Sequence, residues 1–459
     1  MDFDAKADGK HDDSSAIKMA INLCSKKNGG TIFFPAGYYL TGPIKLNNNI
    51  TLYFDAGAVI NFIDDFSKYA PVFTRWEGVE CYALSPLIFG NDLKNINIIG
   101  YGILNGNGKK WWDKIINRRK EQRNNPETSI EKKLAKLNPG YETAGSGGGG
   151  REMQFLRPPL IQLFKCNNIK LDGITCKNSP FWNTHLVYCN NVNISNMNFI
   201  NPSDAPNTDG LDIDSCTNIH ISNCNFDVGD DCLCLKSGTD NDGRRVGRAT
   251  ENVTITNCTM LHGHGGIAIG SDIAGGIKNV VISNSIFIGT ERGIRIKSRR
   301  GRGGVVEDIH ANNIIMKRVL CPIVMNLLYK CGANENDGHL FSLNKQKITD
   351  ETPIIRNISI SNITAREVYT AACFLHGLPE SRIKNIRFDN IEIEFTNDSS
   401  KKGGEAAMAY GIKLQTKSGF WAKYIENARF SNVRIRGINK KQMEIYDSID
   451  YIIDDLKKY

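Results

Sequence analysis

A short motif, Asn followed by alternating apolar residues, recurs along this chain and limits the folds that it can adopt. Clear copies begin at Asn168, Asn191, Asn218, Asn252 and Asn279, and looser copies begin at Asn357 and Asn385. The first four intervals between copies are 23, 27, 34 and 27 residues. Period-two alternation is typical of a strand with one buried face, and self-similarity at this period is typical of stacked units that share a core. The repeat therefore predicts an all-β fold, a right-handed parallel β-helix.

The residue types within the repeat favour this solenoid over its main competitor. Asn suits the turn at the start of each strand, because its side chain tolerates left-handed backbone angles and can bond its own backbone. Asn residues stacked in successive coils would also form a ladder. Leucine-rich repeats are the alternative solenoid, but their leucine-dense consensus is missing from this chain.

The repeat also suggests how the chain is organised. Solenoids lengthen by adding units and need no second core, so residues 1–459 are interpreted as a single domain. Residues 1–30 are expected to cap the N-terminal end, with a helix over Ser14–Lys26. Coils are expected over residues 31–440, with a charged, partly helical loop insertion near 109–151 that ends in the glycine-rich run 145–150. Residues 441–459 lack the repeat and are expected to form a C-terminal tail over the last coil.

The composition narrows the class of protein. Hydrophobic residues make up 41% and charged residues 23% of the chain, which is ordinary for a soluble globular protein. A run of about 18 apolar residues, which a membrane span requires, does not occur in the sequence. The first residues lack the basic and apolar regions of a secretory signal, so we expect a cytoplasmic protein or one whose leader has been removed. The 13 cysteines are an odd number and resemble small buried hydrophobic residues more than a disulfide framework, which favours a reducing compartment.

Much of the formal net charge of +8 is concentrated in one basic segment. It contains Arg292, Arg295, Lys297, Arg299, Arg300 and Arg302. Nucleic acid is the usual partner for such a run, but this segment has neither interleaved aromatic residues nor a nucleic-acid-binding motif. A carboxylated polymer is an equally good electrostatic partner, and a solvated basic loop is the structural alternative for residues 299–302. Arg295 and Lys297 differ from the others, because alternation places both on the same face of a strand.

Four short segments in the middle of the chain carry ionisable residues about one repeat apart. They are Asn207-Thr208-Asp209-Gly210, Gly229-Asp230-Asp231-Cys232, Gly263-His264-Gly265 and Arg295-Ile296-Lys297. Asp209 and Asp230 are 21 positions apart, Asp231 and His264 are 33 apart, and His264 and Arg295 are 31 apart. Because neighbouring strands of a parallel sheet lie about 4.8 Å apart, stacked coils would bring three carboxylates, an imidazole and two cations to one surface patch. Such a patch predicts an acid/base site for an anionic substrate.

In this order, the four segments resemble the signature of the polygalacturonase family, glycoside hydrolase family 28. The resemblance runs from Asp2 to the neighbourhood of Arg436, and four ordered motifs are far more specific than any one of them. The N-terminal residues 7–9 and 12–13 are shared more broadly among pectin-active β-helix proteins. Residues 75–78, 179–182 and 202–206 are similar to segments of bacterial members, many of which release sugars from the non-reducing end.

The resemblance implies hydrolysis of α-1,4 bonds between galacturonic acid units with inversion at the anomeric carbon. Inversion needs a protonated acid at the leaving oxygen and a carboxylate that activates water, about 6.5 to 9.5 Å apart. By the resemblance, Asp230 is the general acid, and Asp209 with Asp231 activates the water. His264 would lie near the acid, and Arg295 and Lys297 would bind the galacturonate carboxylate.

Other polar residues near these motifs receive weaker assignments. Asn207 is expected to contact the substrate, and neither a metal nor a cofactor is implied by the resemblance. Asp212 and Asp214 have either a substrate or a structural role. His185 and His262 are interpreted as structural residues, because they fall outside the motifs.

Exo action from the non-reducing end is the favoured mode, because the insertion near 109–151 is a candidate wall across a substrate groove. Endo action and hydrolysis of another pectic uronide are the alternatives within this chemistry. A calcium-dependent pectate lyase and a non-catalytic carbohydrate-binding β-helix are the alternatives from other classes. The expected partner is a pectic oligosaccharide or polysaccharide, not nucleic acid or a membrane, and the sequence leaves the oligomeric state open.

Overall fold

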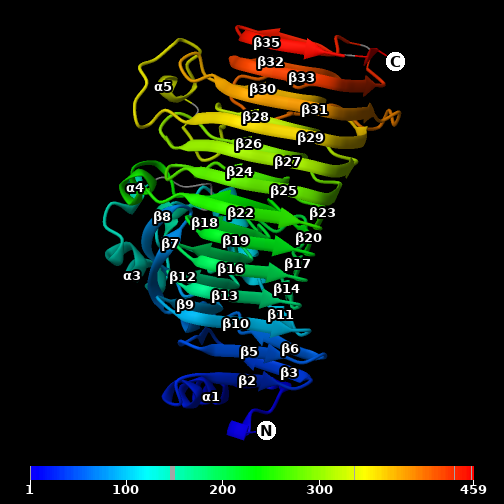
Figure 1. Cartoon of the computed structure of the whole chain (residues 1–459). Helices are drawn as coiled ribbons and strands as arrows, with labels where there is room; N and C mark the ends of the chain where they lie inside the picture. Colours follow the sequence, from blue (N-terminus) through cyan, green and yellow to red (C-terminus); the bar gives the residue numbers. More distant parts are fainter. Residues whose placement is uncertain (1, 145–149, 335, 439, 456, 459) are drawn as a thin grey trace. The chain divides into compact units, whose positions relative to one another are not determined.

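The computed structural model describes residues 2–144, 150–334, 336–438, 440–455 and 457–458. The chain divides into two compact units, Met1–Asp230 and Asp231–Tyr459. Each unit consists of coils whose strands pair in parallel with those of the next coil, which is the parallel β-helix predicted from the repeat (Figure 1).

In Met1–Asp230, each complete coil contributes one strand to each of three parallel ladders. The first ladder contains β4 (Ile44–Lys45), β9 (Ile88–Asn91), β12 (Ile161–Phe164), β15 (Thr184–Val187) and β18 (Leu211–Asp214). The second contains β2 (Gly30–Phe34), β5 (Ile50–Phe54), β10 (Lys94–Gly100), β13 (Asn167–Asp172), β16 (Asn190–Ser195) and β19 (Thr217–Ser222). The third contains β1 (Asp8–Asp12), β3 (Gly37–Thr41), β6 (Ala58–Phe62), β11 (Ile103–Asn105), β14 (Thr175–Lys177), β17 (Asn198–Ile200) and β20 (Asn225–Val228).

In Asp231–Tyr459, the coils continue with longer strands. One ladder contains β21 (Leu233–Lys236), β24 (Gly265–Gly270), β26 (Arg292–Lys297), β28 (Cys321–Asn326), β30 (Ala371–His376), β32 (Ser418–Lys423) and β34 (Met443–Tyr446). The other contains β22 (Thr250–Thr256), β23 (Thr259–His262), β25 (Ile277–Ile288), β27 (Val305–Lys317), β29 (Ile354–Val368), β31 (Ile383–Phe395), β33 (Ile425–Arg436), β35 (Ile449–Asp454) and β36 (Lys457–Lys458).

Residues 441–459, expected to form a C-terminal tail over the last coil, contain strands that pair with that coil. β34 pairs in parallel with β32, and β35 pairs in parallel with β33. The Asn motif is absent there, yet backbone pairing to the previous coil needs no particular side chain. The stack therefore extends beyond the last recognisable repeat.

The predicted role of Asn in the coils is confirmed. All seven repeat Asn residues have positive φ, between 54° at Asn385 and 60° at Asn218. Their amides also form ladders: Asn279 Nδ2 donates to Asn252 Oδ1 at 3.1 Å, and Asn385 Nδ2 donates to Asn357 Oδ1 at 2.9 Å. Each turn is thus stabilised both by its own geometry and by the coil below it.

Alternation within the strands places the core. In β13, Ile169 and Leu171 are buried while their neighbours Asn168 and Lys170 are exposed. The cysteines behave as small core residues as predicted: none of the 13 described cysteines forms a disulfide, and all but Cys24 and Cys331 are buried. No helix in the described part of the chain is long and apolar enough to cross a membrane.

The predicted N-terminal helix is confirmed, with the bounds Ser14–Lys26 for α1. It lies beside β2 (Figure 1) and buries Ala16, Ile17, Ala20 and Ile21, which recur on one face of the helix. A short 3-10 helix, η1 (Asp2–Asp4), precedes it.

The insertion near 109–151 is helical in part, as predicted. It contains α2 (Lys109–Lys120), α3 (Ser129–Leu137), η3 (Tyr141–Thr143) and the start of η4 (Arg151–Met153), and its glycine-rich residues 145–149 lie outside the described part. Glu131 of α3 joins the two helices through Lys114 at 2.6 Å and Arg118 at 2.6 Å. On the other face of α2, Trp111 packs on Phe66 of η2 (Phe66–Lys68) with ring centroids 4.3 Å apart.

An antiparallel hairpin that the repeat does not predict packs on the first ladder. It consists of β7 (Pro71–Trp76) and β8 (Val79–Leu84). Thr74 donates to Gln162 Oε1 of β12 at 2.6 Å, and Arg75 Nη1 donates to Asp214 Oδ1 of β18 at 2.7 Å. Asp214, left open by the sequence, therefore has a structural partner in the hairpin.

Two of the segments that resemble bacterial sequences help to hold this hairpin in place. Trp76 stacks on Phe181 with ring centroids 4.9 Å apart, and Trp182 belongs to the same buried cluster. His185 is also buried here, with Nδ1 2.8 Å from Gln162 Nε2, in agreement with its structural assignment.

The solvated-loop alternative for residues 299–302 is wrong. Arg299, Arg300 and Arg302 are all buried. Arg300 makes a two-pronged contact with Glu380 at 2.6 and 3.0 Å, and Arg302 lies 3.2 Å from Asp240 of α4 (Asp240–Val246). Arg300 also donates to carbonyl groups around α5 (Gly338–Phe341), including Ser342 O at 2.7 Å. These three arginines are therefore internal residues and do not form a solvated basic loop.

Candidate active site

The predicted site residues are divided between the two units at the Asp230-Asp231 bond. Asn207, Asp209 and Asp230 belong to Met1–Asp230, and Asp231, His264, Arg295 and Lys297 belong to Asp231–Tyr459.

In the first unit, Asp209 and Asp230 lie close together at the ends of coil segments. Asp209 precedes β18 and is buried, and Asp230 follows β20 and is half-buried. One oxygen of each carboxylate lies within 4.8 Å of the other. Gly229 permits this approach, because a Cβ there would lie 2.6 Å from the carbonyl oxygens of Pro202 and Ala205.

The limit of 4.8 Å refers to the nearest oxygens of Asp209 and Asp230. The separation of about 6.5 to 9.5 Å expected for an inverting pair refers to whole carboxyl groups, so it is longer. The distance between the nearest oxygens still suits a bridging water molecule, since hydrogen bonds between oxygens measure about 2.5 to 3.0 Å. The pair can therefore hold one water between an acid and a carboxylate.

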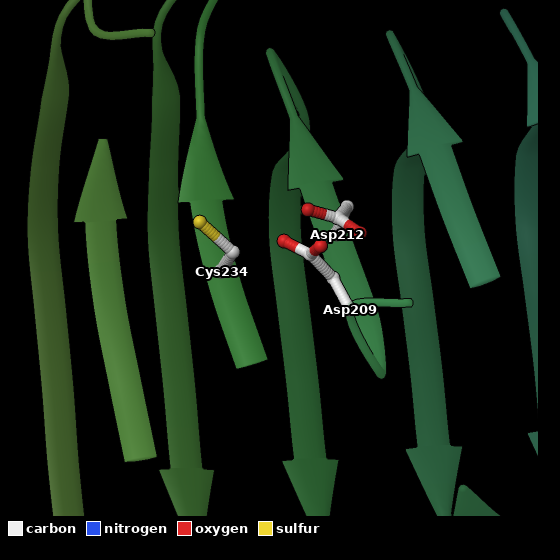
Figure 2. A group of neighbouring side chains, drawn as sticks. All are labelled: Asp209, Asp212 and Cys234. Atoms are coloured by element: carbon white, nitrogen blue, oxygen red, sulfur yellow. The ribbon is translucent and has the colours of Figure 1, made fainter. Parts of the chain in front are cut away.

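Asp212 lies next to Asp209, as Figure 2 shows. It is fully buried in β18, and one of its carboxylate oxygens lies within 4.8 Å of one from Asp209. Asp212 thus extends the acidic cluster, whereas Asp214, two residues further on, is held by Arg75. The sequence offered no reason to distinguish Asp212 from Asp214, but in the structure Asp212 lies beside a carboxylate and Asp214 beside a guanidinium group.

Asn207 is held by two arginines of the same unit. Its Oδ1 accepts hydrogen bonds from Arg119 Nη2 at 2.9 Å and from Arg157 Nη2 at 2.8 Å. Arg157 also donates to Pro206 O at 2.7 Å. This carbonyl oxygen of Asn207 is therefore engaged by the protein, and its predicted contact with substrate stays a prediction.

In the second unit, Asp231 is the centre of a buried ion cluster. Lys297 Nζ lies 2.6 Å from Asp231 Oδ2, and Arg295 Nη1 lies 3.0 Å from Asp231 Oδ1. Arg295 and Lys297 point to the same side of β26, as alternation predicts. Gly265 leaves room for the carboxylate, since a Cβ there would lie 2.7 Å from Asp231 Oδ1.

The cations therefore have a partner within the protein that the sequence did not predict. Both also lie over the ring of Tyr329, with Arg295 Cζ 5.6 Å and Lys297 Nζ 5.2 Å from its centroid. Their predicted contact with a substrate carboxylate stays a prediction.

The cluster fixes the charge of Asp231. Burial alone would raise the pKa of Asp231, but the Lys297 ammonium and then the Arg295 guanidinium lower it well below its ordinary value. Burial and Arg295 act to lower the pKa of Lys297, yet Asp231 raises it above its ordinary value. Asp231 consequently remains a carboxylate under mildly acidic conditions, as a group that activates water must.

We expect Lys297→Met to move the acid limb of the pH profile of kcat/KM to higher pH. Asp231 has a lowered pKa in the folded protein, so its ionised form persists until the pH falls through that value. Removing the nearest cation raises this pKa, and the ionised form is then lost at a higher pH. Kinetic profiles of the wild type, Lys297→Met and Lys278→Met would test this. Lys278 serves as the control because it is half-buried, is paired with Glu251 and lies outside the four segments. An acid limb that does not move in Lys297→Met would show that Asp231 does not control it.

Glu291 is a residue of the site that the sequence interpretation missed. Its Oε2 lies 3.0 Å from His264 Nδ1, and its backbone N–H donates to Gly263 O at 2.9 Å. Burial alone would raise the pKa of Glu291, but the hydrogen bond to His264 and the charge of Arg292 lower it to about 2. Glu291 therefore orients the ring of His264 as an ionised acceptor.

A signal for Glu291 was present in the sequence. Glu291 follows His264 by 27 residues, the same interval as between Asn252 and Asn279. Residues one repeat apart stack in a β-helix, and Arg292 does lie in register with Gly265. The period could have placed Glu291 over His264.

The carboxylates of the first unit could also bind a metal ion. Asp209 with Asp212, or with Asp230, offers oxygen ligands of the kind that calcium takes. Calcium takes about six to eight such oxygens, more than either pair supplies by itself. The absence of a metal requirement stays a prediction.

Comparison with known proteins places these segments in a family. The family model "Glycosyl hydrolases family 28" matches residues 147–409, and the model "Rhamnogalacturonase A/epimerase, pectate lyase-like" matches residues 1–108. A "Probable polygalacturonase" of Vitis vinifera is 30% identical over 412 residues, which cover 87% of this chain and 75% of that protein.

Solved structures agree with this match. An exopolygalacturonase from Thermotoga maritima is 32% identical with a TM-score of 0.72, and the match covers 86% of each chain. A polygalacturonase from Erwinia carotovora is 24% identical with a TM-score of 0.64, covers 85% of this chain and 92% of its own, and supports the fold. The predicted right-handed parallel β-helix is thereby confirmed. With all four polar segments inside the matched residues 147–409, this chain belongs to glycosyl hydrolases family 28.

Proposed function

We propose that this protein hydrolyses the α-1,4 bonds of polygalacturonate and oligogalacturonides, and that it acts from the non-reducing end. One observation carries the proposal: the family 28 match contains all four polar segments, and the carboxylates of Asp209 and Asp230 lie within 4.8 Å of each other. A pair of carboxyl groups is what glycoside hydrolysis requires.

Asp230 acts as the general acid in this proposal, because it is half-buried and can meet a glycosidic oxygen. Asp231 is kept ionised by Arg295 and Lys297 and activates water together with Asp209. Protonation of the leaving oxygen and attack by this water on the opposite face of the sugar produce inversion.

The remaining groups orient the substrate. In this proposal His264, which is held by Glu291, assists the acid, and Arg295 and Lys297 bind a galacturonate carboxylate. The pH profile of Lys297→Met also bears on the role of Lys297. A shift of the acid limb reports the effect of Lys297 on Asp231, whereas a loss of kcat/KM at every pH reports weaker substrate binding.

Exo action is supported by two observations. The insertion folds as α2 and α3, and Arg119 of α2 reaches Asn207, two residues before Asp209. The Thermotoga maritima structure with 32% identity is described as an exopolygalacturonase. Endo action and hydrolysis of another pectic uronide are the alternative outcomes of the same assay.

Incubation with trigalacturonate tests the proposal. We expect new reducing ends and monomer from the first moment, no rise in absorbance near 235 nm and no effect of a chelator. Unsaturated product or loss of activity with the chelator would indicate a calcium-dependent lyase, and bound but intact trimer would indicate a binding protein. Early release of dimer and larger fragments from a longer chain would indicate endo action. The anomer formed first, followed by proton NMR, would establish the stereochemistry.

A further inference from the structure

Two guanidinium groups converge on one neutral acceptor beside the acidic pair. Asn207 Oδ1 accepts from Arg119 Nη2 at 2.9 Å and from Arg157 Nη2 at 2.8 Å. Asn207 is two residues before Asp209, so the guanidinium pair lies at the edge of the acidic cluster. An anion that binds beside Asn207 would interact favourably with both guanidinium groups.

The two arginines have different tasks. Arg157 is completely buried, donates to Pro180 O at 2.9 Å and lies 5.0 Å from the centroid of the Phe181 ring. Its hydrogen bond to Pro206 O holds the backbone directly before Asn207. Arg119 is an exposed residue in the last turn of α2, so a ligand can approach it from solvent.

The charges of the two groups interact. Burial and then the neighbouring Arg119 lower the pKa of Arg157 to about 9, while Glu77, Asp230 and Asp209 act to raise it. Arg157 therefore keeps its charge in neutral and acidic solution, and the repulsion between the two guanidinium groups decreases when an anion binds between them and the solvent.

The end of α2 offers an ordinary explanation for its basic residues, since cations stabilise a helix C-terminus. That explanation fits Lys120, which is exposed, and Arg118 is buried against Glu131 at 2.6 Å. Arg119 differs from both because it reaches across to Asn207. The insertion thus brings one exposed cation to the loop that carries Asp209.

We propose that Arg119 is a specificity-determining residue that binds the carboxylate of the terminal galacturonate unit of the substrate. This inference rests on the proposed function, because it concerns the same site. A carboxylate can accept two parallel N–H groups from a guanidinium fork, and a methyl ester or a neutral hexose offers no such charge. The coils alone could not supply this contact, since α2 belongs to the insertion.

Kinetics of Arg119→Leu, with Lys120→Leu as the matched control, test the inference. Lys120 is the next residue, is also exposed and loses the same charge. With trigalacturonate, Arg119→Leu should raise KM by about 10- to 100-fold, the usual range for a charge-assisted hydrogen bond, while Lys120→Leu stays near the wild type. With a trimer methyl-esterified at its non-reducing unit, measured by its Ki as a competitive inhibitor, Arg119→Leu and the wild type should be equal.

The length of the substrate identifies the unit that is bound. Contact with the terminal unit predicts the same increase in KM for the dimer, trimer and hexamer, whereas an increase that grows with length would overturn the assignment to that unit. Arg119→Lys, which keeps the charge but not the fork, should lie between the wild type and Arg119→Leu.

Failure of this inference differs from failure of the proposed function. If the wild type leaves trigalacturonate intact, the proposed function is wrong. If the wild type cleaves it and Arg119→Leu behaves like Lys120→Leu, or if Arg119→Leu weakens the free and esterified trimers equally, the role of Arg119 is overturned alone.

Discussion

Replacing Asp230 by Asn should lower kcat on trigalacturonate by about 10²- to 10⁴-fold, the usual contribution of a general acid, while changing KM little. Asn keeps the size and the hydrogen-bonding shape of the side chain but cannot donate a proton to the leaving oxygen. Asp230 follows β20 and is half-buried, so the substitution exchanges a reactive group without removing core contacts. Initial rates give kcat, and calorimetric titration of the inactive variant gives the affinity for the substrate.

The matched control for this substitution is Asp204→Asn. Asp204 lies before Asp209 in the same unit, is exposed and outside the four motifs, and its replacement should leave kcat unchanged. Full activity of Asp230→Asn would show that Asp230 is not the general acid. A loss of binding as large as the loss of kcat would instead indicate a role in holding the substrate.

The parts of the fold that the sequence predicts are those with local or periodic causes. The Asn residues of the repeat adopt left-handed backbone angles and form ladders because each copy meets the next at a fixed interval. The helix Ser14–Lys26 follows from its own apolar spacing. In contrast, the hairpin of β7 and β8 depends on Asp214, 139 positions after Arg75, and no period relates the two.

In the candidate site, too, the sequence predicts the features that have a local or periodic cause and not those that depend on distant residues. The motifs of family 28 predict which residues carry the chemistry, but not that Asp231 is enclosed by Arg295 and Lys297, because pairing between site residues is a matter of three-dimensional geometry. Glu291 could have been found from the 27-residue interval after His264. Arg119 could not, since the insertion has no repeat that would relate its position to Asn207.

The largest expected effect on stability comes from Asp214→Asn. Arg75 and Asp214 are both fully buried, with Nη1 and Oδ1 2.7 Å apart. Removing the carboxylate leaves the guanidinium charge buried without its counterion, and breaking such a pair costs about 3 to 5 kcal/mol of the free energy of unfolding. We expect the midpoint of urea unfolding to fall accordingly, with an unchanged m-value.

Two further variants separate the buried charge from other effects. Asp113→Asn breaks the exposed pair with Lys109, whose atoms are 2.8 Å apart, and should change the free energy of unfolding by about 0 to 1 kcal/mol, as surface pairs do. The double variant Arg75→Met/Asp214→Asn removes the uncompensated charge and should recover part of the stability lost in Asp214→Asn. If the double variant is instead less stable than Asp214→Asn, the packing of Arg75 against Tyr188, 4.6 Å from its ring centroid, outweighs its charge. If Asp214→Asn is as stable as Asp113→Asn, the pair does not hold the hairpin to β18.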